Sequence, residues 1–203
     1  MFLDRDGTLN KDAGYLSNPR EFQLLPGVVE GLNILQQRGF QLVVVTNQSG
    51  IARGYFTEQQ LADIHREMVR QLAENGIELA GIFYCPHHPQ DIQRTQHAQP
   101  THHAQHAPQH QGVRQAYVRS CGCRKPLPGL LLEAAEKLKL DLASSFMVGD
   151  KATDILAGKA AGCRSILIAP SFSDGDTEIV AAATADFVSA DFLEAARWIV
   201  NCG

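Results

Sequence analysis

The chain begins MFLDRDGTLN (residues 1–10), and this stretch predicts both a strand and the position of a site. An apolar run over residues 1–3 gives way to two carboxylates, Asp4 and Asp6, and then to Gly7. An apolar run that breaks into glycine is typical of a buried strand that turns into a loop. Both carboxylates are therefore expected at the carboxyl end of the first strand.

Length and composition limit the class of protein. With 203 residues, 44% of them hydrophobic, the chain can bury a sizeable core, and one domain over residues 1–203 is expected. The formal net charge of −4 gives no electrostatic reason to expect nucleic acid or an anionic membrane as a partner. The sequence contains no apolar stretch of membrane-spanning length and no signal-peptide pattern. We therefore expect a cytoplasmic, monomeric protein that acts on a small soluble molecule.

Apolar runs alternate with segments of helical periodicity along most of the chain. Strands are expected at residues 40–45, 82–84, 146–148 and 165–168, and helices at 27–39, 57–76, 130–138, 155–161 and 192–199. Thr57 and Gln60 are spaced as a capping box at the start of one helix. This alternation predicts an α/β fold in which helices cover both faces of a mainly parallel sheet.

Polar side chains follow the predicted strands where each strand ends. In an open parallel sheet, functional groups gather beyond the carboxyl ends of the strands, so these residues are expected to form one set. The set contains Asp4, Asp6, Thr46, Asn47, Gln48, Ser49, Asp150 and Lys151, with Arg124 and Lys125 placed just before a helix. Taken singly, each has an ordinary explanation as a turn cap or a solvated charge. Together they predict phosphoryl transfer through a carboxylate nucleophile.

The two carboxylates of the first loop have distinct expected roles. An ionised Asp4 can attack phosphorus and form an aspartyl phosphate, which divides one hydrolysis into two displacements. Asp6 can protonate the departing oxygen and then accept a proton from the attacking water. Two carboxylates repel a phosphate dianion by about 4 kcal/mol per charge pair at 4 Å and an effective dielectric of 20, so cations are required.

Those cations are expected from a metal ion and a lysine. Asp4, Asp6 through a backbone carbonyl of the turn, and Asp150 offer the hard oxygen ligands that Mg²⁺ prefers. Lys125 supplies a further positive charge. The Thr46 hydroxyl and the backbone N–H of Asn47 can donate to the phosphoryl oxygens.

Four segments resemble, in order, the motifs of the haloacid dehalogenase superfamily of phosphatases: DRDGT (4–8), TNQSG (46–50), the lysine of CRKP (123–126) and GDKATD (149–154). SGIARGYF (49–56) and CPHHP (85–89) narrow the likeness to the D-glycero-D-manno-heptose 1,7-bisphosphate phosphatases. The resemblance implies a Rossmann-like doubly wound sheet without a separate cap domain. It also implies a sugar bisphosphate as substrate and the roles given above for Asp4, Asp6, Thr46, Lys125 and Asp150. The anomer is left open.

Two alternative functions are compatible with parts of this pattern. Histidinol phosphate is the second substrate candidate, because similar phosphatases that act on it share the zinc loop and the two carboxylates. The second alternative is a phosphoaspartate receiver module, which holds the phosphate. It is disfavoured because Thr46, and no aspartate, follows the strand at 40–45.

A CxH pair and a CxC pair lie between residues 85 and 123: Cys85 with His87, and Cys121 with Cys123. Residue types alone fit a closed tetrahedral zinc site and a chance grouping of thiols and histidines equally well. The resemblance favours structural zinc, with His88 as the alternative to His87. The intervening His/Gln-rich insertion, at about 90–116, has almost nothing apolar to bury and is predicted to be disordered.

Substrate contacts are expected from several cations and from the first loop. Arg53 and Arg124 offer fork-shaped donors, and Lys151 adds a charge, although each arginine could equally be a solvated loop residue. The resemblance places Asp12, Gly14 and Tyr15 at the sugar. Asn47, Gln48 and Ser49 are also expected to bind the substrate. Asp154 is expected either to orient a metal-bound water or to cap its own helix.

Only three residues precede Asp4, fewer than in the sequences that this chain resembles. We expect either a shortened first strand or a true start that lies further upstream.

Overall fold

A six-stranded parallel sheet forms the centre of the computed structural model, which describes residues 1–89, 112–169 and 184–202. Its strand order is β3-β2-β1-β4-β5-β6, and every neighbouring pair is parallel. The strands are β1 (Phe2–Leu3), β2 (Leu42–Asn47), β3 (Leu79–Cys85), β4 (Phe146–Gly149), β5 (Arg164–Ile168) and β6 (Phe187–Ser189). This order confirms the predicted doubly wound sheet.

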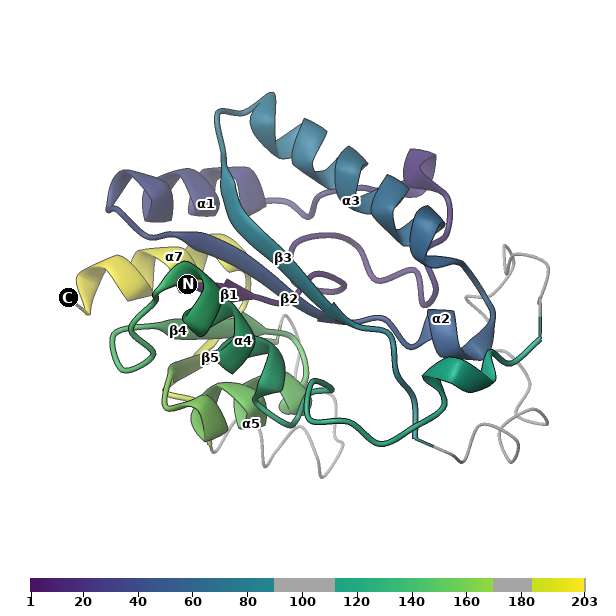
Figure 1. Ribbon diagram of the computed structural model, residues 1–203. Helices are drawn as coiled ribbons and strands as arrows, with labels where there is room; N and C mark the ends of the chain where they lie inside the picture. Colours follow the sequence, from purple (N-terminus) through teal and green to yellow (C-terminus); the bar gives the residue numbers. More distant parts are fainter. Residues whose placement is uncertain (90–111, 170–183, 203) are drawn as a thin grey trace.

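Helices cover both faces of this sheet (Figure 1). One face carries α1 (Val28–Gln37), α3 (Glu58–Ala73) and α7 (Phe192–Asn201), and the other carries α4 (Gly129–Leu138) and α5 (Ala152–Ala161). The short helix α2 (Gly50–Arg53) follows β2, and two 3-10 turns, η1 (Pro19–Glu21) and η4 (Gln115–Tyr117), lie in loops. None of the described helices is long and apolar enough to cross a membrane.

The central strands bury both of their faces, as expected for a parallel sheet. Leu3 and Val148 belong to the cluster beneath α1, α3 and α7, whereas Phe2 and Met147 belong to the cluster beneath α4 and α5. Successive side chains of a strand point to opposite faces, so adjacent residues enter different clusters. This explains why these strands are continuously apolar in sequence.

The chain leaves β1 toward β2 and β3 and later returns to β4 on the other side of β1. Adjacent parallel strands whose connections run in opposite directions leave a crevice at their carboxyl ends, which is where ligands bind in such sheets. Although β1 has only two residues, it pairs with β2 and β4, and the Asp4 N–H extends the ladder by donating to Val148 O at 2.9 Å. Asp4 is thereby fixed at this crevice.

Most predicted elements occur with small shifts at their ends. The Thr57–Gln60 capping box is confirmed, with the Thr57 hydroxyl accepting from Gln60 N at 3.0 Å and the Gln60 side chain accepting from Thr57 N at 2.8 Å. β2 begins two residues later than predicted, because Phe40 N still donates to Leu35 O and closes the end of α1. The four-residue α2 and the three-residue β6 were not predicted, since neither is long enough to show a period.

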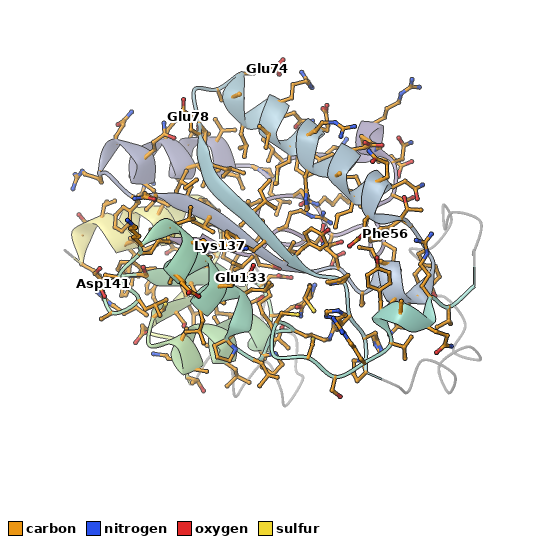
Figure 2. The ribbon with its side chains drawn as sticks, viewed as in Figure 1. Phe56, Glu74, Glu78, Glu133, Lys137 and Asp141 are labelled. Carbon is orange, nitrogen blue, oxygen red and sulfur yellow. The ribbon has the colours of Figure 1, made fainter. Side chains whose placement is uncertain are left out.

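Two further features concern α2 and its surroundings. A side chain on Gly50 would collide with the Phe56 ring, which packs beside α2 (Figure 2). Residues 90–111 of the predicted disordered insertion lie outside the described residues. Residues 112–116 are described, and Arg114 N donates to Ala52 O at 2.9 Å, which joins this segment to α2.

Candidate active site and metal centres

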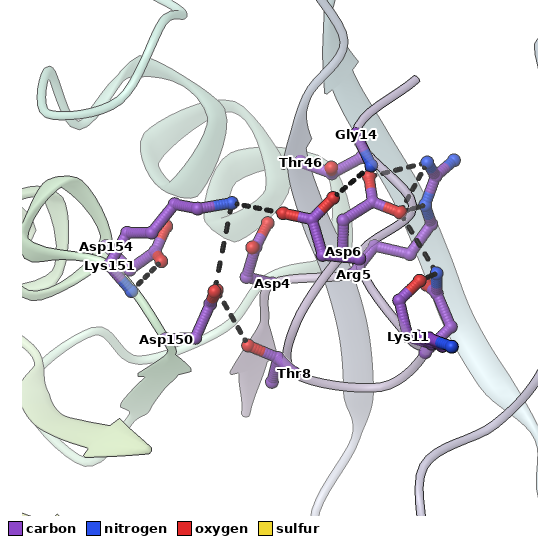
Figure 3. Close-up of polar contacts among 12 residues, drawn as sticks. Asp4, Arg5, Asp6, Thr8, Lys11, Gly14, Thr46, Asp150, Lys151 and Asp154 are labelled. Carbon is purple, nitrogen blue, oxygen red and sulfur yellow. Dashed lines mark hydrogen bonds and ion pairs between the residues drawn. The ribbon is translucent and has the colours of Figure 1, made fainter. Parts of the chain in front are cut away.

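The loops beyond β1, β2 and β4 meet the segment before α4 around one cleft. Figure 3 shows Asp4, Asp6, Thr46, Asp150 and Asp154 around a shared space. The cleft has a volume of about 380 Å³. Its lining is mostly polar: Asp4, Asp6, Asp12, Gly14, Tyr15, Thr46, Asn47, Gln48, Ser49, Gly50, Arg124, Lys125, Lys151, Thr153 and Asp154.

Lys125 is the buried cation at the floor of this cleft. Its ammonium group donates to Asp4 Oδ1 at 2.7 Å and to Val45 O at 2.8 Å, and lies 2.6 Å from Asp154 Oδ1. Burial disfavours the charged ammonium, but the carboxylates of Asp154 and Asp4 outweigh it and raise the pKa of Lys125. Lys125 therefore carries a fixed positive charge beside the expected nucleophile.

Asn47 holds the backbone of Lys125 in place. The Asn47 side chain donates to Lys125 O and accepts from Lys125 N, both at 3.1 Å. Since Asn47 is the last residue of β2, the sheet positions the lysine segment directly. The predicted convergence of residues 46–47 and 125 is thus present.

Three carboxylates form a group suited to a divalent cation. Oxygens of Asp4, Asp150 and Asp154 all lie within 4.8 Å of one another. Burial raises the pKa of Asp4 to about 6, with Lys125 opposing the rise and Asp154 adding to it. Burial and the neighbouring Asp4 charge raise the pKa of Asp150 to about 7. A divalent cation would favour the ionised form of these crowded carboxylates. Their oxygens are the hard ligands that Mg²⁺ prefers, so the donor set fits this ion.

The turn after β1 brings Asp150 close to the backbone. Gly7 has a φ of +88°, a conformation that favours glycine, and a Cβ at this position would collide with the Asp150 carboxylate. The Thr8 hydroxyl donates to Asp150 Oδ1 at 3.4 Å. The DGT sequence therefore both turns the chain and seats the carboxylate of Asp150, which follows β4.

Asp6 is surrounded by hydrogen-bond donors. The Arg5 guanidinium donates to both of its oxygens, at 2.6–3.1 Å, Asn10 Nδ2 donates at 3.0 Å, and Gln48 Nε2 donates at 2.8 Å. Burial alone would raise the pKa of Asp6, but the charge and hydrogen bonds of Arg5 lower it overall. The Asp6 side chain lies outside the group formed by Asp4, Asp150 and Asp154. Its metal contact through the backbone stays a prediction.

Thr46 is buried next to Asp6. Its hydroxyl oxygen accepts from Gln48 Nε2 at 2.9 Å, so the hydroxyl hydrogen can be donated to another acceptor. Gln48 therefore links the Thr46 hydroxyl to the Asp6 carboxylate. Both residues were predicted from the strand end, but this link between them was not.

The mouth of the cleft carries the residues predicted to contact a sugar. Lys151 Nζ lies 3.0 Å from Asp12 Oδ2, and Asp12 Oδ1 accepts from Gly14 N at 2.8 Å. Tyr15 is 39% exposed, and its ring packs against Tyr55 with ring centroids 4.3 Å apart. An aromatic face beside charged groups is thereby presented to the cleft.

The two predicted arginines occupy different positions. Arg124 lines the cleft, and its NH1 group donates to His87 O at 3.3 Å. Arg53 is not among the residues that line this cleft, and its NH2 group contacts His88 Nε2 at 2.6 Å. Its substrate contact stays a prediction, and the Arg53–His88 pair joins α2 to the loop after β3.

Cys85, His87, Cys121 and Cys123 converge on one point. The sulfur atoms lie 3.2–3.5 Å apart, and His87 Nδ1 lies 3.3 Å from Cys123 Sγ and 3.7 Å from Cys85 Sγ. With Zn–S bonds of about 2.3 Å, a regular tetrahedron has edges of about 3.8 Å, so the four donors fit a slightly contracted structural zinc site. His88 instead contacts Arg53 and Pro89 O. The donor set therefore contains His87.

Comparison with known proteins gives strong matches. Residues 122–195 match a family model described as HAD-hydrolase-like. The chain is 44% identical over 168 residues to the D-glycero-beta-D-manno-heptose-1,7-bisphosphate 7-phosphatase of Pasteurella multocida, covering 83% of this chain and 79% of the relative. It is 39% identical over 201 residues to the protein of the same name from Yersinia pestis, covering 99% of this chain and 89% of the relative.

This chain belongs to the D-glycero-beta-D-manno-heptose-1,7-bisphosphate 7-phosphatase family. The 7-phosphatase family is one of phosphoric monoester hydrolases of the HAD type, which confirms the predicted enzyme class. A solved structure of D,D-heptose 1,7-bisphosphate phosphatase from B. bronchiseptica, complexed with magnesium and phosphate, has a TM-score of 0.74 and 31% identity. The alignment covers 100% of this chain and 98% of that chain. This 7-phosphatase family member therefore shares its HAD-like fold with that solved structure.

Three features of the site were missed or left open in the sequence. Asp154 caps α5 by accepting from Lys151 N at 3.0 Å, which is one of its two expected roles, but its ion pair with Lys125 was not foreseen. Thr153 lines the cleft without having been predicted. Arg5 was overlooked because a lone arginine in a loop is usually solvated, whereas here it is 1% exposed.

Proposed function

We propose that this protein hydrolyses the 7-phosphate ester of D-glycero-beta-D-manno-heptose 1,7-bisphosphate with the help of Mg²⁺. The observation that carries the proposal is the grouping of Lys125 with Asp4 and Asp154 in the lining of one cleft, with Asp150 beside these carboxylates, in a chain of this family. The beta anomer follows the names of the relatives. A cleft of about 380 Å³ is of the size that holds a small ligand.

In the first step, Asp4 attacks the phosphorus atom of the 7-phosphate. The bond between phosphorus and the sugar oxygen breaks as the Asp4–phosphorus bond forms, and Asp6 in its protonated form gives the departing oxygen a proton. Arg5 lowers the pKa of Asp6 in the free site, but the negative charge of a phosphoryl group beside Asp6 favours the protonated form. Lys125 binds one oxygen of Asp4, which leaves the other as the attacking atom. The products of this step are the heptose 1-phosphate and an aspartyl phosphate on Asp4.

In the second step, water attacks the phosphorus atom of the aspartyl phosphate. Asp6, now a carboxylate, accepts the water proton, and the bond between phosphorus and Asp4 breaks to release inorganic phosphate. Both steps use Asp6 on the leaving or entering oxygen, and the second restores the starting form of Asp4. The cycle therefore balances without any other reactant.

Charge on the phosphoryl group is met from several sides. The Thr46 hydroxyl, the Asn47 N–H and the Lys125 ammonium are the proposed donors to the phosphoryl oxygens. Asp4, Asp150 and the adjacent Asp154 would hold Mg²⁺, which when bound neutralises phosphoryl charge. Since all three carboxylates are close together, the metal is also expected to stabilise the folded site.

Recognition of the sugar and of the second phosphate is assigned to the mouth of the cleft. Arg124 and Lys151 are the proposed partners of the 1-phosphate, because both line the cleft and carry positive charge. Asp12, Gly14 and Tyr15 are the proposed sugar contacts. Zinc on Cys85, His87, Cys121 and Cys123 would fix the segment that presents Arg124 and Lys125, since Cys123 directly precedes them.

A substrate panel with purified protein tests the proposal. Phosphate release is measured with Mg²⁺ on the beta and alpha anomers of the heptose 1,7-bisphosphate and on histidinol phosphate. We expect the beta anomer to have the highest kcat/KM, and loss of the 7-phosphate only. A preference for histidinol phosphate would overturn the substrate.

A nucleophile variant tests the chemistry independently of the substrate. Asp4→Asn is expected to abolish turnover, because an amide cannot form the aspartyl phosphate, while the control Asp63→Asn, on the outer side of α3, is expected to retain it. Acid quenching during turnover should trap label from the substrate phosphate on wild-type protein and not on Asp4→Asn. Equal turnover of the two variants would eliminate Asp4 as the nucleophile.

A further inference from the structure

We propose that Arg5 is a positioning residue that fixes the orientation of the Asp6 carboxylate, and that His65 in α3 in turn fixes Arg5. The inference rests on the acid–base role of Asp6 in the proposed function. It concerns two buried side chains that take no other part in that mechanism.

Arg5 heads the fully buried side chains of the described chain when they are ranked by volume, with 1% of its surface exposed. Its Nε and NH2 groups donate to Asp6 Oδ1 at 3.1 and 2.8 Å, and NH2 also donates to Asp6 Oδ2 at 2.6 Å. A planar guanidinium that contacts both oxygens of a carboxylate fixes its plane as well as its distance. A point charge such as lysine fixes only the distance.

The burial of this guanidinium requires an explanation, because an arginine is almost never fully buried unless it is paired. Within the described ranges, Asp6 is the only carboxylate in an ion pair with Arg5, and Arg5 is the only cation in an ion pair with Asp6. The two residues are neighbours in sequence, so this ion pair does not connect segments that are distant in the chain. Its position at the reacting carboxylate is therefore better explained by function than by folding.

His65 supports Arg5 from behind. Arg5 NH1 lies 3.3 Å from His65 Nε2, which must accept because the guanidinium only donates. His65 is 8% exposed on the buried side of α3, and its ring meets Tyr84 edge-on with centroids 5.9 Å apart. Burial and the Arg5 charge lower the pKa of His65 to about 3, so the ring stays neutral and keeps its acceptor.

The remaining donors to Asp6 come from other directions. Asn10 Nδ2 reaches Oδ1 from the first loop, and Gln48 Nε2 reaches Oδ2 from the end of β2. Neither contacts both oxygens. Arg5 alone among these donors fixes the carboxylate plane. His65 contacts Arg5 from α3, sixty residues further along the chain, and so fixes the position of the guanidinium relative to this helix.

Orientation of Asp6 matters unequally for different phosphate esters. A sugar oxygen leaves only when it is protonated, so a rotated Asp6 slows the first step. Nitrophenolate leaves as an anion without a proton, so the first step with p-nitrophenyl phosphate does not depend on Asp6 in this way. Both substrates need Asp6 again when water attacks the aspartyl phosphate.

The test compares these two substrates in Arg5→Lys and Arg5→Met. Acid–base catalysis contributes roughly 10²- to 10⁴-fold, so kcat for the heptose bisphosphate should fall by about 10²-fold or more, with KM within about threefold of wild type. With p-nitrophenyl phosphate, both variants should give a rapid burst of nitrophenolate, about one per chain, followed by slow turnover. Arg70→Lys, at an exposed ion pair of α3, is the matched control and should resemble wild type.

Substitutions of His65 separate positioning from folding. His65→Gln keeps an acceptor for Arg5 NH1 and should retain most activity, whereas His65→Leu removes it and should show the burst pattern in weaker form. If Arg5→Met does not fold, Arg5→Lys and His65→Leu carry the test. Equal losses on both substrates without a burst, or wild-type kinetics in all variants, would overturn the inference.

The outcome is separable from the proposed function. Wild-type protein that releases phosphate from neither substrate contradicts the proposed function itself. Wild-type protein that is active on the heptose bisphosphate, with Arg5 variants that are equally active, contradicts only the positioning role of Arg5.

Discussion

Lys125 Nζ lies 2.7 Å from Asp4 Oδ1, although 121 residues separate the two in sequence. The same ammonium lies 2.6 Å from Asp154, so one buried cation serves two buried carboxylates. We expect Lys125→Met to lower kcat by about 10²-fold or more, a loss of roughly the size seen when one preorganised donor is removed. Because it leaves buried charges unpaired, its free energy of unfolding should fall by about 3–5 kcal/mol, measured by urea denaturation without Mg²⁺.

An exposed lysine provides the control. Lys137 pairs with Glu133 one turn away on the outer side of α4 (Figure 2). Such pairs contribute a few tenths of a kcal/mol, and the Lys137 ammonium also lies 5.6 Å from the centroid of the Phe83 ring. Lys137→Met should therefore change stability by less than about 1 kcal/mol and leave kcat unaltered. A Lys125→Met protein as active as Lys137→Met would contradict the role of Lys125.

The residues that were predicted share a simple property. Asp4, Thr46 and Asp150 each lie at the end of a strand or directly after it, and parallel strands deliver their carboxyl ends to one edge of a sheet. Lys125 is on no strand. It was predicted from its position between the CxC pair and the start of a helix, and from the family resemblance. The course of the backbone therefore places this part of the site, and the apolar pattern of the sequence predicts where the strands end.

The residues that were missed depend on long-range side-chain contacts. Arg5 and His65 lie sixty residues apart and meet only because α3 packs over the loop after β1. A hydrophobic period indicates that one side of α3 is buried, but it does not tell which polar group that side meets. The pairing of Asp154 with Lys125 was hidden for the same reason.

Gly7 gives a second prediction. Alanine there would be strained at a φ of +88°, and its Cβ would collide with the Asp150 carboxylate. We expect Gly7→Ala to displace Asp150 and weaken Mg²⁺ binding. The Mg²⁺ concentration that gives half-maximal activity should therefore rise by about tenfold or more, measured by Mg²⁺ titration of activity, as for the loss of a group that orients a metal ligand.

The control for Gly7 separates strain from collision. Gly39 has a φ of +82°, and among the described residues beyond its two chain neighbours no atom lies within 4 Å of the position that an added Cβ would take, so Gly39→Ala carries similar backbone strain without a clash. It should lose some stability and keep the wild-type Mg²⁺ dependence. An unchanged Mg²⁺ dependence in Gly7→Ala would show that Asp150 does not need this close approach.

Removal of zinc gives a third prediction. Purified protein should contain about one zinc ion per chain by elemental analysis, and a chelator that strips it should lower both Tm and kcat, because the Cys121–Cys123 segment leads into Arg124 and Lys125. Cys123→Ser should behave like the chelated protein. Cys202→Ser, outside the cluster, should keep its zinc. Full activity after complete loss of zinc would contradict the link between the two sites.

His65 predicts how stability depends on pH. Its pKa is about 3 in the folded protein against an ordinary 6.5, so only the unfolded chain takes up this proton as the pH falls below 6.5. Unfolding is then favoured at lower pH, and this residue alone lowers the free energy of unfolding by about 1.4 kcal/mol per pH unit between pH 6.5 and 3.

Asp4 and Asp150 change stability with pH in the opposite direction to His65, so their contribution must be subtracted. The raised pKa values of Asp4 and Asp150, about 6 and 7, favour the folded state at low pH and lose that effect as the pH rises through those values. Urea denaturation of wild type and His65→Gln at about pH 7.5 and pH 5 isolates His65, because the aspartates are common to both. Wild type should lose about 2 kcal/mol more than His65→Gln between the two values, since about 1.5 pH units of the His65 window are crossed. Equal losses in the two proteins would show that His65 is protonated in the folded state.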